Sequence, residues 1–333
     1  MLTIIWREKA KREKKFLTDG RKVMQVVLTL TREITELFLI LLMGYAIVKT
    51  GKLAASDSKS VSVILVYLIL PCVIINAFQI DYTPHVRDGL LYALAIAVAV
   101  HILFILLTKM LRGPLKLDVT EQLTAVYTNA GILVIPLIKV LLGDEYVIYS
   151  CAFIVVQLIL LWTHCRGKLN AEEKFSWKEL LCNINIISIM IGAILFFLHI
   201  RIPALIGETI DMLAGMVGPV GMLLAGMVIA DTPLRDVFVH PRNYVAVVLR
   251  LFLYPILLLC LFRVFSAADL IADGKNILLT VYLACITPAC ATVTSMAQLY
   301  HGNAARASLL YVLTTVCSIL SMPLMIELYE LWI

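Results

Sequence analysis

The chain has 333 residues, of which 61% are hydrophobic and 15% are charged, and its formal net charge is +5. A water-soluble domain does not bury this proportion of apolar side chains, whereas a lipid bilayer solvates them directly. The composition excludes an ordinary soluble protein and predicts an all-α polytopic membrane protein.

The chain starts with a basic extension at residues 1–23. Residues 1–22 contain eight Lys or Arg and three Asp or Glu residues, so their net charge of +5 equals that of the whole chain. The extension could hold the N-terminus in the cytoplasm, lie on anionic lipid as a basic helix, or be untranslated. We favour translation from Met24, because Gly20-Arg21-Lys22 can be encoded by a purine-rich run typical of a bacterial ribosome-binding site.

Ten apolar segments of about membrane-spanning length follow the extension. They are residues 34–49, 58–79, 89–108, 119–142, 145–165, 181–200, 204–230, 243–265, 276–300 and 306–329. The longest hydrophilic connection divides them into a five-helix repeat at residues 24–166, a loop at 167–180 and a second five-helix repeat at 181–333. An odd number of helices in each half requires the second half to be inverted in the membrane.

The distribution of Lys and Arg predicts how these spans are oriented. Loops after odd-numbered spans contain thirteen of these residues, whereas loops after even-numbered spans contain five. Cytoplasmic loops are enriched in Lys and Arg, so we expect a multi-pass protein of the cell membrane with its central loop in the cytoplasm. Both termini are then extracellular.

Two of the spans contain a proline that has a counterpart earlier in the same half of the chain. Pro136 lies in the fourth span and Pro288 in the ninth, and Pro71 and Pro219 precede them by 65 and 69 residues. A proline inside a helix removes a backbone hydrogen bond and clashes with the preceding turn. Gly- or Pro-interrupted segments at corresponding places in two halves are the best sequence indicator of a transporter's midplane binding site.

The residues around these prolines predict where new half-helices begin. Thr287 is a good N-cap and Pro288 suits the first helical position, so a half-helix is expected to start there. In the fourth span Gly131 and Pro136 bracket a similar interruption, which Asn129 precedes. No capping side chain stands directly before Pro136, so a bound anion is one candidate partner for the free amides.

The two interruptions together predict a substrate site where the fourth and ninth spans cross. Each helix N-terminus carries roughly +0.5 charge and unpaired N–H groups, so two such ends could hold a carboxylate without Lys or Arg. The residues expected to bind substrate are Tyr127, Thr128, Asn129, Gly131, Pro136, Gln157, Thr287, Pro288 and Thr292. A bond between helices is an equally good interpretation for Gln157, and a simple helix kink is the alternative for each proline.

Other notable residues are better explained by packing. The eight cysteines show no CxxC spacing and lie in apolar runs, so no disulfide, metal site or other cofactor is predicted. His101 in the third span is interpreted as a packing histidine. The small residues from Gly215 to Gly226 predict a surface where helices pack closely.

Six short motifs occur in order along the chain. They are Thr128-Asn129-Ala130-Gly131, Ile135-Pro136-Leu137, Leu142-Gly143-Asp144-Glu145, Leu161-Trp162-Thr163, Thr287-Pro288-Ala289 and Ala297-Gln298-Leu299-Tyr300-His301-Gly302. In these residues, and over the chain from Met24 to its C-terminus, the sequence resembles the auxin efflux carrier family and in particular its bacterial members.

This resemblance implies ten transmembrane helices in two inverted five-helix repeats, with broken helices 4 and 9 that cross. Members of the family transport organic anions, including auxin in plants and dicarboxylates such as malate or malonate in bacteria. Asn129 matches the family's polar crossover asparagine, and Pro136 and Pro288 match its crossover prolines.

The chain departs from the family pattern at three positions near the interruptions. Bacterial relatives often have a second Asn and a Gly where Ile132 and Val134 stand, and their ninth helix often has an Asn near the place of Thr292. Fewer polar groups leave the identity of the substrate open and make a smaller or less polar anion conceivable.

The sequence therefore predicts a secondary carrier that moves a small mono- or dicarboxylate by alternating access. No carboxylate pair lies beside the interruptions, so facilitated flow or coupling to protons is preferred over sodium. The expected partners are the anion, protons and the lipid bilayer, with no nucleic acid; a homodimer stays open. The alternatives are a sodium- or proton-coupled symporter or antiporter of a related inverted-repeat fold, and a non-transporting receptor. An enzyme is not expected, since no nucleophile elbow or HExxH motif is found.

Overall fold

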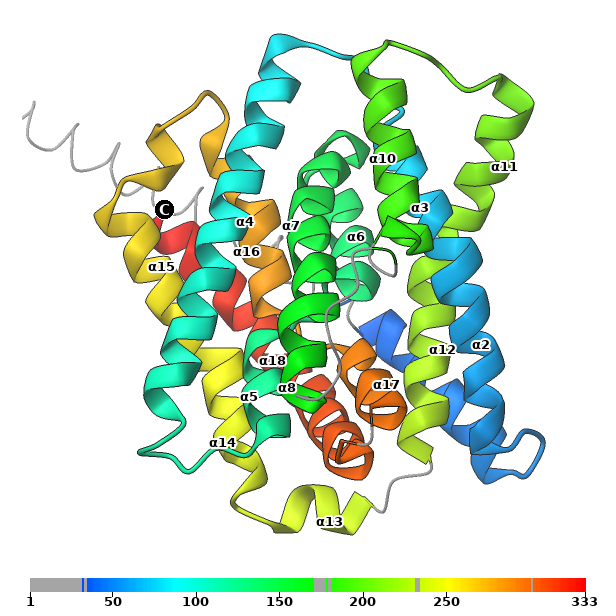
Figure 1. The fold of residues 1–333 in the computed structure, drawn as a ribbon, viewed down its shortest axis with the longest axis vertical. Coiled ribbons are helices and arrows are strands. Elements are labelled where there is room, and N and C mark those ends of the chain that lie inside the picture. The colour runs from blue at the N-terminus through cyan, green and yellow to red at the C-terminus, as the bar shows by residue number, and fades with distance from the viewer. Residues whose placement is uncertain (1–31, 33–34, 171–177, 179–180, 231–233, 301) are drawn as a thin grey trace, which may run out of the picture.

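The computed structural model describes residues 32, 35–170, 178, 181–230, 234–300 and 302–333 (Figure 1). The basic extension and most of the predicted central loop lie outside the described residues. Within the described part the chain is almost entirely helical and forms no strand, only one isolated bridge between two residues. The predicted all-α class is confirmed.

The first half of the described chain begins with a helix at residues 35–49. The elements that follow are η1 (Ala55–Asp57), α2 (Ser58–Ile64), η2 (Leu65–Ile69), α3 (Leu70–Ala77), α4 (Pro84–Leu111), α5 (Val119–Val126), α6 (Ala130–Leu141), η3 (Asp144–Tyr146), α7 (Val147–Leu160), η4 (Leu161–Cys165) and α8 (Arg166–Leu169). Because α8 continues to Leu169, the first three residues of the predicted loop 167–180 are helical.

The second half of the described chain also consists of long and short helices. Its elements are α10 (Ile184–Phe197), α11 (Ala204–Gly215), α12 (Val217–Ala230), α13 (Leu234–Val239), α14 (Asn243–Val248), η5 (Leu249–Leu253), α15 (Tyr254–Val264), η6 (Ala267–Asp269), α16 (Gly274–Ile286), α17 (Ala291–Leu299) and α18 (Ala304–Trp332).

Six helical stretches in the described residues are long and apolar enough to cross a membrane. They are Ala55–Ala77, Pro84–Leu111, Asp144–Leu169, Ala204–Ala230, Asn243–Val264 and Ala304–Trp332. These stretches correspond to the second, third, fifth, seventh, eighth and tenth predicted spans. The fourth and ninth predicted spans fall short because each is divided into two helices, α5 with α6 and α16 with α17.

The earlier prolines of the two pairs do not break their helices in the same way. Pro71 follows the π-helical turn η2, and the helix runs through it from Ala55 to Ala77. The wider hydrogen-bond spacing of a π turn accommodates the missing N–H of a proline. Pro219 lies in the first turn of α12, just after a single-residue interruption at Met216. Pro71 therefore does not interrupt its span.

The helices form two groups that lie side by side (Figure 1). Helices α2, α3, α10, α11 and α12 pack on one another at one side of the molecule. The second group contains α4, α5, α7, α14, α15, α16, α17 and α18. Helix α12 of the first group packs against α6 and α18, so α6 lies where the two groups meet.

The helix at residues 35–49 approaches α12 backbone to backbone. A Cβ atom at Gly226 would lie 1.9 Å from the carbonyl oxygen of Leu41, and one at Gly44 would lie 2.2 Å from that of Leu223. Only glycine permits such an approach, so the predicted close packing surface is confirmed at Gly226. At Gly215 a Cβ atom would meet no other atom within 4 Å.

Contacts between loops show which helix ends lie together. At one end, Arg242 before α14 and Arg306 at the start of α18 both pair with Glu121 of α5. At the other end, Tyr146 before α7 donates a hydrogen bond of 2.5 Å to Asp273 before α16. Loops that follow odd-numbered predicted spans thus meet at the first end, and loops that follow even-numbered spans meet at the second.

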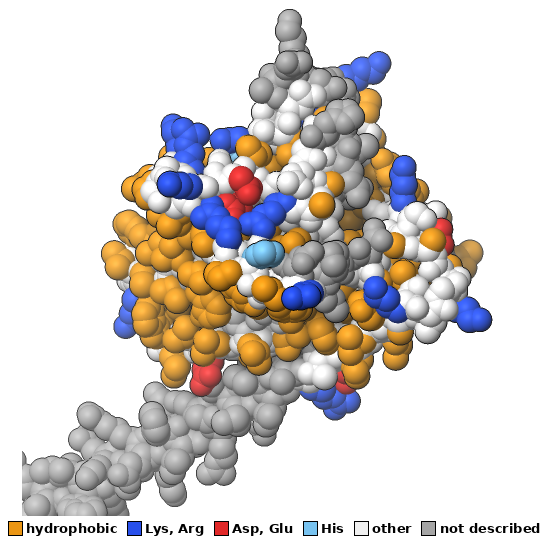
Figure 2. All heavy atoms as spheres, turned by 90° about the horizontal axis from the view of Figure 1, so that it is seen from below, with side chains coloured by type: hydrophobic (Ala, Val, Ile, Leu, Met, Phe, Trp, Pro, Cys, Tyr) orange, Lys and Arg blue, Asp and Glu red, His pale blue; other side chains and the backbone are white. Residues whose placement is uncertain are grey.

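The first end, where α13 lies in Figure 1, carries several Lys and Arg side chains. Figure 2 views the molecule from this end and shows basic side chains on the face and around its rim, among many hydrophobic ones. This arrangement is consistent with the predicted alternation of loops. Its placement in the cytoplasm stays a prediction.

Candidate functional site

The two interrupted helices break at short extended segments that pair with each other. Residues 127–129 connect α5 to α6, and residues 287–290 connect α16 to α17. Thr128 and Ala289 form an antiparallel bridge between these segments. We call these two paired segments the crossing.

Two backbone hydrogen bonds hold the crossing together. The Asn129 amide donates to the carbonyl oxygen of Pro288 at 2.9 Å, and the Cys290 amide donates to that of Tyr127 at 3.1 Å. A helix interruption inside a membrane protein leaves backbone groups without partners, and each unpaired group is unfavourable away from water. Each break therefore supplies partners for the other.

The sequence located both breaks inaccurately. Pro136 lies inside α6, which begins at Ala130, so the first interruption precedes the predicted one. Thr287 ends α16 instead of starting a new helix, and its hydroxyl donates to the carbonyl oxygen of Ala284 at 2.9 Å. The predicted half-helix start at Pro288 is wrong, because the chain stays extended to pair with residues 127–129, and α17 begins only at Ala291.

Gln157 of α7 supports the first break. Its side-chain oxygen accepts hydrogen bonds of 2.9 Å from both the amide and the hydroxyl of Thr128, and its Nε2 donates to the Thr128 carbonyl oxygen at 2.9 Å. Both residues are buried. Of the two interpretations of Gln157, the structure shows the bond between helices.

Tyr127 points away from the crossing toward α7. Its hydroxyl donates to the carbonyl oxygen of Leu160 at 2.9 Å and lies 2.9 Å from Nδ1 of His164. The side chain is fully buried. Tyr127 therefore anchors the end of α5 to the neighbouring helix.

The carbonyl ends of α5 and α16 share one partner that sequence analysis missed. Arg250 lies in the π-helical turn η5 and is fully buried. Its guanidinium donates to the carbonyl oxygens of Ala125 at 3.1 Å and Thr287 at 3.1 Å, and also to that of Cys285. A charged residue in the middle of an apolar span is by default a functional candidate, and that signal was present in the sequence.

The amide ends of α6 and α17 differ from the carbonyl ends, because neither N-cap residue caps them with a side-chain oxygen. The Asn129 side chain makes no capping bond, and at Cys290 only the sulfur, a weak acceptor, lies within interaction range of the amides of Thr292 and Val293. Asn129 is buried, and its Nδ2 has no hydrogen-bond partner among the described residues, although its side chain lies within interaction range of the Tyr311 hydroxyl. Thr294 in the first turn of α17 also has an unpartnered hydroxyl in this part of the structure.

The first turns of α6 and α17 are the accessible part of this region. Thr292 is exposed, and Gly131 and Ala291 are half-buried, whereas every residue of the crossing itself is buried. Of the predicted site residues, Thr128, Asn129, Thr287 and Pro288 thus lie in the crossing, Gly131 and Thr292 lie in the adjoining first turns, and the side chains of Tyr127 and Gln157 serve contacts with α7, which leaves Pro136. That residue faces α12, where a Cβ atom at Gly218 would lie 3.0 Å from its Cγ atom.

A small cavity lies one helical turn beyond Asn129, between the two groups of helices. It has a volume of about 20 Å³, which is room for about one water molecule. Leu133, Leu137, Thr315 and Ser318 line one side, and Met222 of α12 lines the other together with residues 37–38.

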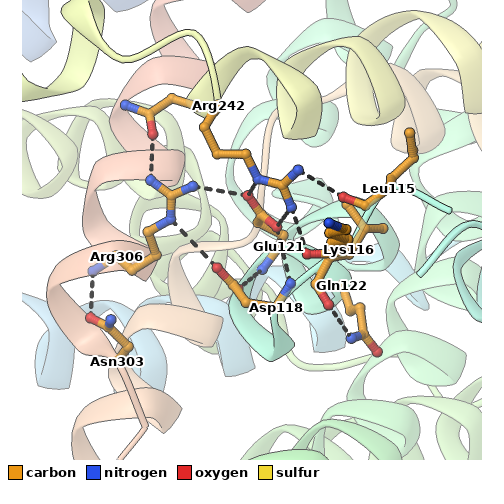
Figure 3. Close-up of polar contacts among 10 residues, drawn as sticks. Leu115, Lys116, Asp118, Glu121, Gln122, Arg242, Asn303 and Arg306 are labelled. Carbon is orange, nitrogen blue, oxygen red and sulfur yellow. Dashed lines mark hydrogen bonds and ion pairs between the residues drawn. The ribbon is translucent and has the colours of Figure 1, made fainter. Parts of the chain in front are cut away.

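An ion-pair network holds the N-terminal end of α5 in place (Figure 3). Glu121 is fully buried and accepts hydrogen bonds from Arg242 at 2.6 and 2.9 Å and from Arg306 at 2.9 Å. Asp118 caps α5 by accepting from the Glu121 amide at 2.8 Å, while the Glu121 carboxylate accepts from the Asp118 amide at 3.0 Å. The network ties α5 to α14 and α18, all within the second group of helices.

The long apolar helices are those of a polytopic membrane protein, and two broken helices joined at their breaks are typical of membrane transporters. The chain belongs to the family described as Membrane transport protein, the auxin efflux carrier family, whose sequence profile matches residues 29–174 and residues 169–326. The resemblance seen in the sequence is thereby confirmed. No curated protein matches the chain.

Proposed function

We propose that this protein is a secondary carrier of the cell membrane that moves a small organic anion, a mono- or dicarboxylate, by alternating access at the crossing. In this proposal ten membrane spans form two inverted five-helix repeats, with the central loop in the cytoplasm and both termini outside. Membership of a transporter family supports the transport function. The charge at the crossing supports the choice of an anion.

The observation that carries the proposal is the uncapped state of α6 and α17. Both helices begin two residues beyond the Thr128–Ala289 bridge, and neither is capped by a side-chain oxygen. Each N-terminus contributes roughly +0.5 charge, so the two together offer roughly one positive charge and several amide donors. A carboxylate matches that charge and accepts those hydrogen bonds.

Asn129 adds a donor to these amides. Its buried Nδ2 has no hydrogen-bond partner among the described residues. Leaving a buried donor unsatisfied is unfavourable by about 1–3 kcal/mol. A bound carboxylate oxygen would satisfy it. Exposed Thr292 and half-buried Gly131 provide access to the same two helix starts.

The way in which the two groups of helices meet supports alternating access. The crossing and its surrounding helices belong to the second group, and α12 of the first group covers α6. The cavity of about 20 Å³ between the groups is too small for a carboxylic acid substrate. Substrate entry therefore requires the two groups to move relative to each other around the crossing.

The proposal is tested by transport in proteoliposomes. Labelled mono- and dicarboxylates are offered to the purified protein at several pH values, and uptake and efflux are measured against protein-free vesicles. At least one carboxylate is expected to move faster than in the control vesicles and to be competed by its unlabelled form. If no member of a broad panel moves specifically, anion transport is refuted.

Two variants then locate the site. Asn129→Ala removes the unpartnered donor, and Asn129→Asp places a negative charge at the same position, so both are expected to abolish specific flux. Asn276→Ala is the matched control, because Asn276 lies at the far end of α16 and bonds to Asp273. Wild-type flux in Asn129→Ala would reject Asn129 as a substrate-binding residue.

A further inference from the structure

Arg250 is a buried cation that contacts the C-terminal carbonyl groups of two broken helices, α5 and α16. Its Nε and Nη1 donate to Thr287 and Ala125 at 3.1 Å each, and its Nη2 donates to Cys285. One guanidinium thus reaches the C-terminal ends of both α5 and α16. The guanidinium carbon also lies 5.4 Å from the ring centroid of Phe104, close enough for a cation–π interaction.

No carboxylate among the described residues pairs with this charge. Arg250 takes part in none of the ion pairs that Asp and Glu form in the part of the chain that the structure describes. An unpaired buried charge is strongly unfavourable unless dipoles replace its hydration. Two helix C-termini carry roughly −0.5 charge each, so together they offset roughly one positive charge.

Carbonyl groups at the ends of broken helices have a known use in inverted-repeat carriers. Half-helix C-termini and unwound carbonyls there coordinate the coupling Na⁺, while half-helix N-termini hold the anionic substrate. In this chain the same kind of carbonyl cluster, from Ala125, Cys285 and Thr287, is filled by a side chain.

We propose that Arg250 is a resident cation that takes the place of a coupling Na⁺ and makes this carrier independent of sodium. Its charge balances the carbonyl ends of α5 and α16 permanently. The uncapped amide ends of α6 and α17 are then left to attract the substrate anion without a co-transported metal ion. This inference rests on the proposed function for its transport consequence, but its structural part concerns an ion-binding position that can be measured without any substrate.

The first experiment needs no substrate and uses purified Arg250→Ala, which removes the guanidinium and leaves its space. Thermal unfolding is followed in choline chloride with added NaCl or with guanidinium chloride at concentrations far below denaturing ones. Added guanidinium or Na⁺ is expected to raise the Tm of Arg250→Ala through binding to the folded state, and to leave the wild-type Tm unchanged. A Tm of Arg250→Ala that neither cation raises would overturn the proposal.

Arg250→Met is the matched control for this experiment. Methionine fills much of the same space without charge or donors, so its Tm is expected to be low and insensitive to both cations. A rise equal to that of Arg250→Ala would show that the cations act elsewhere, and this result also overturns the proposal. If Arg250→Ala folds only when guanidinium or Na⁺ is present during purification, that dependence is the expected rescue. Failure of Arg250→Ala to fold in every salt, while Arg250→Met folds, overturns the proposal.

The second experiment measures flux of the carboxylate that the wild-type protein transports. Wild-type and Arg250→Lys flux is expected to be equal in NaCl, KCl and choline chloride at the same ionic strength. Arg250→Ala flux is expected to fall about tenfold in choline chloride, which corresponds to about 1.4 kcal/mol, and to recover partly with guanidinium or Na⁺. Wild-type or Arg250→Lys flux that requires Na⁺ would refute the role of Arg250 as a resident cation.

The two proposals fail in different ways. Absence of carboxylate flux in every salt, together with a guanidinium-dependent Tm in Arg250→Ala, rejects the proposed function and retains the ion-binding position. Carboxylate flux that depends on Na⁺ in the wild-type protein retains the carrier and rejects the role of Arg250.

Discussion

The backbone amide of Asn129 donates a hydrogen bond of 2.9 Å to the carbonyl oxygen of Pro288 and so joins the two broken helices at their interruptions. A proline carbonyl is available for this bond because the chain remains extended from Thr287 to Cys290. The same bond places the Asn129 side chain at the start of α6. One backbone contact thus determines both how the breaks are stabilised and where the candidate site lies.

Gln157→Leu is expected to destabilise the crossing. The substitution leaves the amide and carbonyl of Thr128 without partners in the interior, which lowers the free energy of unfolding by about 2–4 kcal/mol. Thr128→Val removes only the hydroxyl bond and is expected to lower it by about 1 kcal/mol. Thermal unfolding in detergent measures both changes.

A double-mutant cycle of Gln157 and Thr128 provides the control. Because the two side chains bond directly, the effects of Gln157→Leu and Thr128→Val should be non-additive. Fully additive effects would show that Gln157 supports the protein through some other contact.

The Glu121 network predicts an unusual order of stabilities. Glu121 is fully buried, so the double variant Arg242→Ala/Arg306→Ala leaves its carboxylate without a basic partner and should be the least stable. Adding Glu121→Gln to that double variant removes the buried charge and should restore about 2 kcal/mol. A triple variant less stable than the double variant would contradict this account of the network.

Gly226→Ala is expected to separate the helix at residues 35–49 from α12. Its new Cβ atom would collide with the carbonyl oxygen of Leu41, and forced repacking of this kind lowers stability by about 1–3 kcal/mol. Gly215→Ala is the matched control, since its Cβ atom meets open space and stability should be unchanged. Equal Tm values for the two variants would refute the close contact.

The sequence predicts the position of the six membrane-length helical stretches of the described residues, because apolar length is a local property of the chain. It also predicts that the fourth and ninth spans are interrupted, and Thr128 and Asn129 lie at the first break as expected. The exact break points were misplaced toward Pro136 and Pro288. A proline indicates that a helix is easily interrupted nearby. Which residues become extended depends on the segment that pairs with them, and that segment comes from the other half of the chain.

The residues that support the crossing were harder to predict for the same reason. Gln157 and Arg250 satisfy backbone groups on helices far away in the sequence, and no spacing pattern reports such contacts. Arg250 could still have been predicted to have a structural or functional partner, because a charged residue inside an apolar span requires one. The ion pairs of Glu121 with Arg242 and Arg306 join α5 to the starts of α14 and α18, and only the folded chain shows these three helix ends together.

The central claim is that the uncapped starts of α6 and α17, with Asn129, form the anion site. Equilibrium binding of the transported carboxylate to purified wild-type, Asn129→Ala, Asn129→Asp and Asn276→Ala proteins tests this most directly. The account predicts saturable binding to the wild-type protein and to Asn276→Ala, and loss of binding in both Asn129 variants that retain the wild-type Tm. Unchanged affinity in Asn129→Asp would contradict it, because a negative charge at these helix starts must repel an anion bound there.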